Sequence, residues 1–420
     1  MKKLKKVLLP MLGVSLLATS VTPAAVQAQE SMSQVETPAV ELRGALDHLL
    51  SEHFVLAVKA MQTQYDGAPG ADEAQAALEQ NAADMEPAIA SIYGEEGGAE
   101  FNRIFSAHNQ YTADYVQAVK DGDEQAQQEA EDMLDSFYGE LASFLATATE
   151  GNLPEEAAFE VLDIHEEQVA DAFDAYVAGD YETVYMTYRE GLSHMFDISA
   201  ALSGAITTQN SDTFKGTATD TDAANLRSDL SASVAEHFAL ATLGMNKEFN
   251  EASDFDFVSW AEDENTADIK AAFASIYGEE GGEQFETIWQ GNHIVAQSEY
   301  VTAAKNNDED GKQAAIDKLH TFADEFGEFL GTATEGNLPK ESATDIVNMH
   351  EEQVINTFEL YVNEDYTGSV DQFREGYAFT FEIGKGLAGA IVAQHPDMFE
   401  EEAMPEMPKT GMGGMSKALT

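Results

Sequence analysis

Histidine is the residue type in this chain that offers the clearest chemistry. The 420 residues include ten histidines and no cysteine, so disulfides and thiolate-bound zinc or iron–sulfur centres are excluded. Neutral imidazole binds copper, zinc, iron and nickel, and three histidines with one open position form a recognised catalytic arrangement. Seven of the ten histidines lie at matching positions of two related parts of the chain, and six of them form three equivalent pairs. They are His53, His108, His165 and His194 in the first part, and His237, His293 and His350 in the second, where Phe379 replaces the fourth.

These histidines are expected near the midpoints of helices. Apolar residues spaced three and four apart predict the helices, and each histidine shares the apolar face. A midpoint residue stays at mid-depth whether its helix runs up or down, so the histidines of one part can share a layer. We therefore predict a mononuclear or dinuclear metal site between facing helices, with copper the first candidate and zinc or iron the alternatives. Rings within about 3–4 Å of one another would support the site, because ligand nitrogens lie about 2 Å from a shared ion.

Four glutamates adjoin these histidines in the sequence: Glu52, Glu166, Glu236 and Glu351. Neighbouring residues on a helix point about 100° apart, so we expect these carboxylates to support the ligands from behind or to form salt bridges. Two alternatives stay open: the histidines are buried and hydrogen-bonded only for packing, or pairs of them bind haem. The Glu-x-x-His, His-Glu-x-x-His, Gly-x-Ser-x-Gly and P-loop motifs are absent, so no catalytic residue is predicted.

A duplication accounts for the recurrence of the histidines. Residues 41–210 reappear at about 225–395, with a shift of 184 residues that later becomes 185. The extra residue of the second copy lies between Trp289 and His293. A period this long indicates a duplicated domain and not a solenoid. The recurring motifs include Glu-His-Phe at 52–54 and 236–238, and Arg-Glu-Gly at 189–191 and 374–376.

Each copy is predicted to be wholly α-helical. No segment alternates convincingly with a period of two, and glycines such as Gly94 interrupt the helical pattern. Five or six helices per copy favour an up-and-down bundle, so the predicted fold is all-α with two tandem homologous bundles. In the first copy the helices are expected over roughly 41–64, 72–93, 96–120, 123–148, 154–177 and 181–209. The predicted domains are a signal peptide at 1–28, repeats at 41–210 and 225–399 joined by a linker at 211–224, and a flexible tail at 400–420.

The N-terminus has the pattern of a secretion signal. Lysines at positions 2, 3, 5 and 6 precede an apolar run over 7–18, and small residues around Ala28 suit cleavage after that position. The run is too short to span a membrane, so we expect a secreted protein. Near the C-terminus, Met-Pro-Lys-Thr-Gly at 407–411 resembles the Leu-Pro-x-Thr-Gly signal that sortases cleave. That resemblance implies attachment to the cell wall, and a flexible tail is the alternative.

The charge of the chain restricts its partners. Lys and Arg number 21 against 77 Asp and Glu, which gives a formal net charge of −56. A surface this negative repels phosphate, so electrostatic binding to nucleic acid or to anionic membranes is excluded. We interpret the charge as an aid to solubility outside the cell.

The chain resembles a group of exported helical proteins of bacilli that are labelled copper amine oxidase-like. The resemblance is carried by residues 49–54, 147–154 and 165–169. The label implies oxidative deamination of primary amines by copper and a tyrosine-derived quinone. The Asn-Tyr-Asp/Glu-Tyr and His-x-His motifs of that chemistry are absent, so no catalytic residue is transferred. Three functions are therefore predicted as alternatives: metal binding through the histidines, a non-catalytic surface spacer or adhesion module, and a copper amine oxidase-like oxidoreductase.

Overall fold

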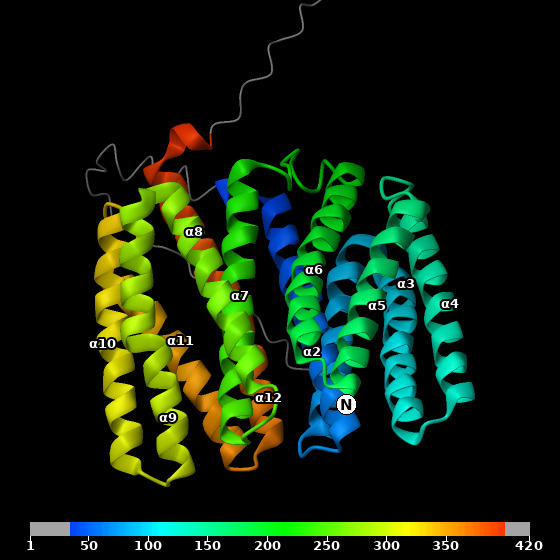
Figure 1. Cartoon of the computed structure of the whole chain (residues 1–420). Helices are drawn as coiled ribbons and strands as arrows, with labels where there is room; N and C mark the ends of the chain where they lie inside the picture. The colour runs from blue at the N-terminus through cyan, green and yellow to red at the C-terminus, as the bar shows by residue number, and fades with distance from the viewer. Residues whose placement is uncertain (1–33, 400–420) are drawn as a thin grey trace, which may run out of the picture.

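The structure is a computed structural model that describes residues 34–399. Within that range the regular structure is entirely helical, so the predicted all-α class is confirmed (Figure 1). The signal peptide predicted at 1–28 and the sortase-like residues 407–411 lie outside the described residues. The first copy contains α2 (Pro38–Asp66), α3 (Ala71–Asp121), α4 (Glu124–Ala148), α5 (Glu155–Ala178) and α6 (Tyr181–Gln209). The second contains α7 (Asp222–Phe249), α8 (Phe255–Ile288), η1 (Trp289–Ile294), α9 (Val295–Lys305), α10 (Glu309–Ala333), α11 (Lys340–Val362), α12 (Tyr366–Gln394) and the short η2 (Pro396–Met398).

Aspartates and prolines fix where several of these helices begin. The Asp123 carboxylate accepts hydrogen bonds from two backbone N–H groups in the first turn of α4, and the Asp180 carboxylate accepts one from the Thr183 N–H of α6. Pro154 directly precedes α5, and Pro339 directly precedes α11. A proline tolerates this position because the first N–H groups of a helix have no partner within it.

The long α3 is a helical hairpin that reverses direction at Gly94. Gly94 has φ 79° and ψ 169°, a conformation that L side chains rarely adopt. The Asn102 side chain donates to Glu86, eight residues to either side of Gly94, so the two segments run antiparallel. Gly278 reverses α8 in the same way. Each copy therefore has six helical segments, and the break falls between the helices expected over 72–93 and 96–120.

The extra residue of the second copy is absorbed within a helix. Residues Trp289–Ile294 form a π-helix, in which the backbone hydrogen bonds skip one residue more than in an α-helix. The equivalent part of α3 is α-helical, with Phe105 and His108 in place of Trp289 and His293. The π-helix thus lets the second copy keep both its aromatic residue and its histidine on the buried face. Such single-turn bulges often occur at functional sites.

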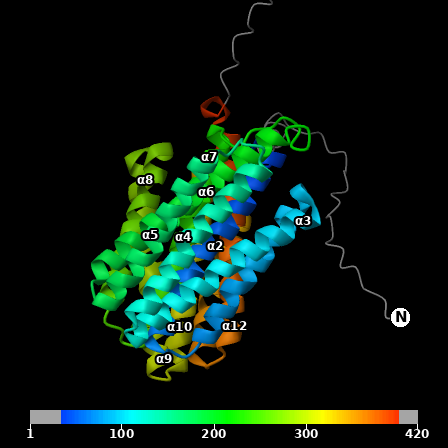
Figure 2. The ribbon, with the colours of Figure 1, turned by 90° about the vertical axis from the view of Figure 1, so that its right-hand side faces the viewer.

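The two sets of helices lie side by side and share apolar contacts. Successive helices pack against each other within each set, and α2 and α6 face α7 and α12 (Figure 1). Phe196 of α6 stacks on Phe381 of α12 across this boundary, with ring centroids 6.3 Å apart. Figure 2 shows that the axes of most helices in both sets are roughly aligned. Part of the predicted linker also packs on α2, because the Arg43 side chain donates to the Thr219 carbonyl oxygen.

The ion pairs across this boundary are reciprocal. Arg189 of α6 contacts Glu236 of α7 at 2.9 Å, and the equivalent Arg374 of α12 contacts Glu52 of α2 at 2.9 Å. Each arginine also contacts a second carboxylate of the opposite copy, namely Asp268 for Arg189 and Asp84 for Arg374. The two copies are therefore related by an approximate two-fold axis, like the subunits of a homodimer.

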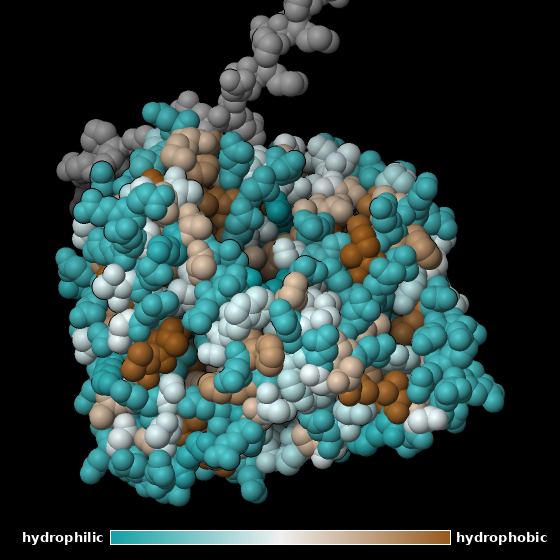
Figure 3. Space-filling model, viewed as in Figure 1, coloured by the Kyte–Doolittle hydropathy of each residue, from teal (hydrophilic) through white to brown (hydrophobic). Residues whose placement is uncertain are grey.

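The visible surface is mainly hydrophilic (Figure 3). Hydrophilic side chains dominate the face in Figure 3, and apolar residues form small separate patches. None of the described helices is long and apolar enough to cross a membrane.

The glycine of each Arg-Glu-Gly motif lies against the phenylalanine of the Glu-His-Phe motif in its own copy. A Cβ at Gly191 would collide with the Phe54 ring, and a Cβ at Gly376 would collide with Phe238. Both phenylalanines are 0% exposed, so neither ring can move aside. We predict that Gly191→Ala destabilises the protein by about 1–3 kcal/mol, as overpacked cores do.

Urea unfolding followed by circular dichroism measures this change. Gly139→Ala in α4 is the matched control, because nothing lies within 4 Å of the added Cβ. That variant should gain about 0.5–1 kcal/mol, since alanine favours a helix more than glycine does. Equal effects of the two substitutions would contradict the close approach of α2 and α6.

A second prediction concerns Asp47, a buried carboxyl between the copies. Asp47 is 2% exposed, and Ser228 of α7 donates a hydrogen bond to it at 2.8 Å. Burial raises the pKa of Asp47 from 3.8 to about 6, despite hydrogen bonds and nearby arginines that lower it. The raised pKa means that the folded protein holds this proton more tightly than the unfolded chain. The protonated carboxyl of Asp47 therefore stabilises the fold fully below pH 4, and this stabilisation is lost as the pH rises through 6.

Asp47→Asn should therefore stabilise the protein at neutral pH, because the amide never ionises. The expected gain is on the order of 2–3 kcal/mol at pH 8 and about 1 kcal/mol at pH 4.5, from about 1.36 kcal/mol per pKa unit. Urea unfolding of both proteins at the two pH values measures the difference. A gain that does not depend on pH would show that ionisation of Asp47 is not its cause.

Candidate metal centre

Three buried histidines of the second copy lie close enough to hold a metal ion. His237 comes from the middle of α7, His293 from the π-helix η1 and His350 from the middle of α11. One ligand atom from each lies within 4.8 Å of the others, and His237 Nε2 is 3.0 Å from His293 Nε2. Two nitrogens bound to one ion at about 2.0–2.1 Å are separated by about 3 Å, so this spacing fits shared coordination. We call these residues the second histidine set.

Neighbouring side chains orient the ring of His293. It stacks on Phe322 with ring centroids 4.5 Å apart and planes at 22°. Its Nδ1 lies 2.9 Å from a carboxylate oxygen of Glu351, so Nε2 faces His237. A carboxylate behind a histidine ligand fixes the tautomer and raises the basicity of the coordinating nitrogen. Glu351 therefore contacts a histidine of another helix and not its sequence neighbour His350.

Burial keeps two of these three imidazoles, those of His237 and His350, neutral. His237 is 0% exposed, and burial together with the neighbouring His293 and His350 holds its pKa well below 6.5. Burial likewise lowers the pKa of His350 to about 4. Burial alone would raise the pKa of Glu351, but the adjacent His293 holds it below its usual value. At neutral pH His237 and His350 therefore offer neutral nitrogen donors, the protonation state that metal binding requires.

The ring nitrogens of His350 give an independent indication of a missing partner. Both are buried, and neither has a hydrogen-bond partner within residues 34–399. Buried polar atoms are normally paired, so a pair of free nitrogens on one ring points to a water or an ion. The donor set therefore fits a metal ion by its chemistry as well as by its spacing.

The first copy arranges its histidines differently. His53 Nε2 and His108 Nε2 are 3.1 Å apart, and the Nδ1 of His108 bonds to the Phe105 carbonyl oxygen. The His165 ring centroid is 5.9 Å from that of His53. Among the described residues, only the second set brings three ligand atoms of His, Asp or Glu within 4.8 Å of one another. We call His53, His108 and His165 the first histidine set.

Glu166 also differs from its counterpart Glu351. Its carboxylate lies 4.0 Å from the Nε2 atoms of both His108 and His165, on the side where an ion would bind. Burial raises the pKa of Glu166 to about 8, so it is mainly protonated at neutral pH. Burial also lowers the pKa of His108 to about 4, of His165 to about 3 and of His53 well below 6.5. The first copy thus holds a neutral acid where the second holds a carboxylate anion.

The fourth predicted histidine lies apart from the others. His194 Nε2 donates to the Val161 carbonyl oxygen at 2.9 Å, and its side chain is 12% exposed. Phe379, its counterpart, is half-buried and lies outside the second set. The midpoint position of His194 in α6 gives the right depth, but its ring turns toward α5. The presence of Phe379 in place of a histidine therefore removes no ligand from the second histidine set.

Glu52 and Glu236 contribute to the boundary between the copies and not to the histidine sets. Each forms the reciprocal ion pair with an arginine of the opposite copy. Asn81 also donates to Glu52 at 2.8 Å, and Asn265 donates to Glu236 at 2.7 Å. This is the salt-bridge role that the sequence left open for them.

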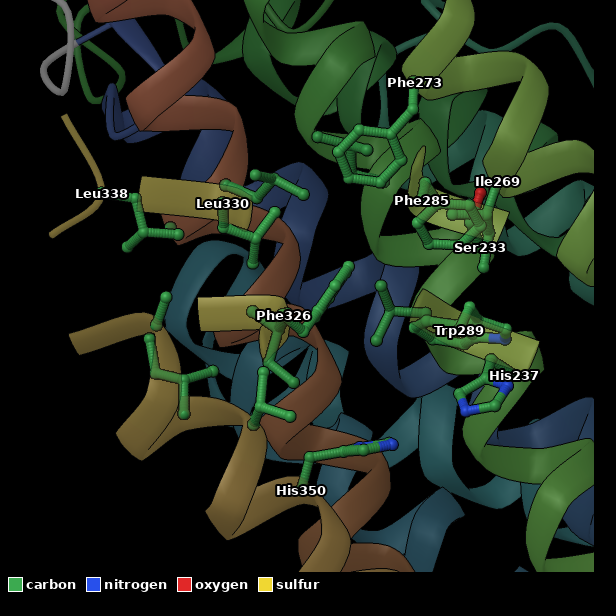
Figure 4. Close-up of a pocket in the computed structure, with 18 of the residues that line it drawn as sticks. Ser233, His237, Ile269, Phe273, Phe285, Trp289, Phe326, Leu330, Leu338 and His350 are labelled. Atoms are coloured by element: carbon green, nitrogen blue, oxygen red, sulfur yellow. The ribbon is translucent and has the colours of Figure 1, made fainter. Parts of the chain in front are cut away.

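A pocket beside the second set was not foreseen from the sequence. It has a volume of about 80 Å³ and is lined almost entirely by apolar and aromatic side chains. Figure 4 shows His237 and His350 at one end of the pocket, with Phe273 and Phe285 toward the other. Ser233 lies on the wall where the first copy has Leu49, so a smaller side chain replaces a larger one. This smaller side chain is the one feature of the sequence that could have indicated the pocket.

Comparison with protein-family models, with curated proteins and with solved structures finds no match to this chain. The histidine geometry is therefore the basis for assigning a function.

Proposed function

We propose that the protein binds one transition-metal ion through His237, His293 and His350. The observation that carries this proposal is the convergence of three buried imidazoles, two of them with Nε2 atoms 3.0 Å apart. Copper is the first candidate, because imidazole donors suit it and divalent copper has the highest affinity in the first-row series. Zinc and iron are the alternatives.

The residues of the second histidine set and those around it have different roles in the proposed site. The three imidazoles supply nitrogen donors, and Glu351 orients His293 from behind. Phe322 and Trp289 pack on the rings and exclude water from the set. A bound ion with three protein ligands keeps a fourth position, where it acts as a Lewis acid or, for copper, as a redox centre. The apolar pocket at His237 and His350 favours a small apolar molecule as the group that approaches this position.

Metal analysis of protein purified without an affinity tag tests the proposal. After incubation with Cu(II), Zn(II) or Fe(II) and removal of the excess, we expect close to one ion per chain. Less than roughly 0.2 ion per chain for all three metals would overturn the proposal, since a buried site loads nearly to completion. Bound metal should also raise the melting temperature, because the unfolded chain lacks the site. A spacer or adhesion module with packed histidines would show no such shift.

A further inference from the structure

The boundary between the copies contains a cleft that the metal proposal does not use. It has a volume of about 480 Å³, within the range of small-molecule sites. Its walls come from the C-terminal ends of α2 and α7, the N-terminal ends of α6 and α12, and parts of α5 and α11. These ends meet between the two sets of helices, at the lower edge of Figure 1. We call this the inter-copy cleft.

Lys59 is the one lysine of the cleft that has no ion-pair partner within residues 34–399. It is half-buried in α2, and its Nζ has no hydrogen-bond or ion-pair partner in the described part of the chain. The ammonium lies 5.3 Å from the centroid of the Phe373 ring, which attracts a cation only weakly. The other lysine of the cleft, Lys247, is paired with Asp254 at 2.6 Å.

The remaining acidic groups of the cleft are already engaged. Asp254 is 2% exposed and accepts a hydrogen bond from the Tyr185 hydroxyl in addition to its contact with Lys247. Asp66 accepts a hydrogen bond from the Tyr176 hydroxyl at 2.6 Å. A ligand that completes the cleft therefore carries one negative charge near Lys59 and not several. Burial lowers the pKa of Lys59 to about 8, so the side chain is still mainly an ammonium at pH 7.

The walls of the cleft suit an aromatic body. Tyr176, Tyr181, Tyr361 and Tyr366 line it from both copies, together with Tyr188 and Phe373. Tyrosine rings offer apolar faces to stack on and hydroxyl groups for polar substituents. We propose that the inter-copy cleft binds a small aromatic monocarboxylate, with its carboxylate on the Lys59 ammonium and its ring among the tyrosines. This site is independent of the histidines.

The second copy supplies the substitution that tests this site. Leu243 occupies the position equivalent to Lys59, so Lys59→Leu installs the residue that the protein already carries on the other side of the axis. Removing a buried charge should leave the fold intact and raise its melting temperature. Loss of ligand binding in this variant would therefore not come from unfolding.

Isothermal titration calorimetry of the full chain with benzoate and phenylacetate measures the binding. We expect saturable binding to the unsubstituted protein at pH 7 and a loss of at least about tenfold in Lys59→Leu, the typical effect of removing a charged hydrogen-bond partner. Lys340→Leu, which removes an exposed lysine paired with Glu328, should bind as the unsubstituted protein does. Absence of binding to both acids at 10 mM, a concentration about tenfold above a millimolar Kd, would overturn the proposal. Equal binding of benzyl alcohol, or equal binding by Lys59→Leu, would overturn the role of the carboxylate and of Lys59.

Discussion

Replacing His350 by alanine should abolish stoichiometric metal binding while the protein stays folded. His350 contributes one of the three converging nitrogens. Both of its ring nitrogens lack a hydrogen-bond partner within residues 34–399, so no hydrogen bond in that part of the chain is lost with the ring. Two imidazoles alone hold an ion far more weakly than three. Support residues around metal sites typically contribute 10–100-fold in affinity, so removal of a ligand should cost more than about 100-fold. Equilibrium dialysis with Cu(II) and Zn(II) measures the affinities.

Two pairs of matched variants make this prediction specific. His194→Ala should bind metal as the unsubstituted protein does, because His194 belongs to the first copy and bonds to the Val161 carbonyl oxygen, outside the second histidine set. Glu351→Gln should weaken binding by about 10–100-fold, because its charge supports the imidazole of His293. The equivalent Glu166→Gln should have little effect, since Glu166 lies beside the first histidine set and not beside the proposed metal site. Stoichiometric binding that survives His350→Ala would place the metal elsewhere.

The second large effect is expected at the boundary between the copies. Arg374→Ala removes the partner of Glu52, whose side chain is 1% exposed. A buried carboxylate without its partner destabilises a protein by about 3–5 kcal/mol. Arg189→Ala should cost less, because its partner Glu236 has a side chain that is 13% exposed and retains some hydration. Urea unfolding of the metal-free proteins measures both changes.

The control for this prediction is an ion pair of similar geometry on the surface. Arg103 contacts Glu100 at 2.8 Å, and both side chains are about half exposed. Such pairs contribute about 0–1 kcal/mol, so Arg103→Ala should be nearly neutral. Adding Glu52→Gln to Arg374→Ala should recover part of the loss, because the buried charge disappears. If Arg374→Ala behaves like Arg103→Ala, the reciprocal ion pairs do not hold the copies together.

The helices could be predicted closely from the sequence because their signals are local. Apolar spacing and the break at Gly94 depend on residues within one or two turns, so the expected and observed ends of the first-copy helices differ by three residues or fewer. The depth of the histidines followed from the same information. The orientations of the histidine side chains could not be predicted in this way, since a midpoint position says nothing about where the ring points. His194 shows this, because it has the depth of the first histidine set but contacts the α5 backbone.

The roles of the glutamates required knowledge of distant contacts. Glu52 precedes His53, whereas Glu351 follows His350, so the two carboxylates turn to opposite sides of their histidines. Glu351 reaches His293, and Glu52 reaches Arg374, which is 322 residues away in the chain. Helical periodicity cannot reveal a contact over that distance. The structure explains both recurring motifs: glutamate and arginine join the copies, and phenylalanine and glycine pack within one copy.

The approximate two-fold axis has a consequence for how the two sites came to differ. In a homodimer every substitution appears in both subunits, so an extra residue beside one histidine would alter both sites at once. Fusion of the two copies into one polypeptide removes that coupling. The second copy carries the inserted residue in its π-helix, while the first keeps a regular α-helix at the same place. Every molecule then contains one of each site in a fixed one-to-one ratio. Two separate subunits would reach that ratio only if each paired with the other kind and never with its own.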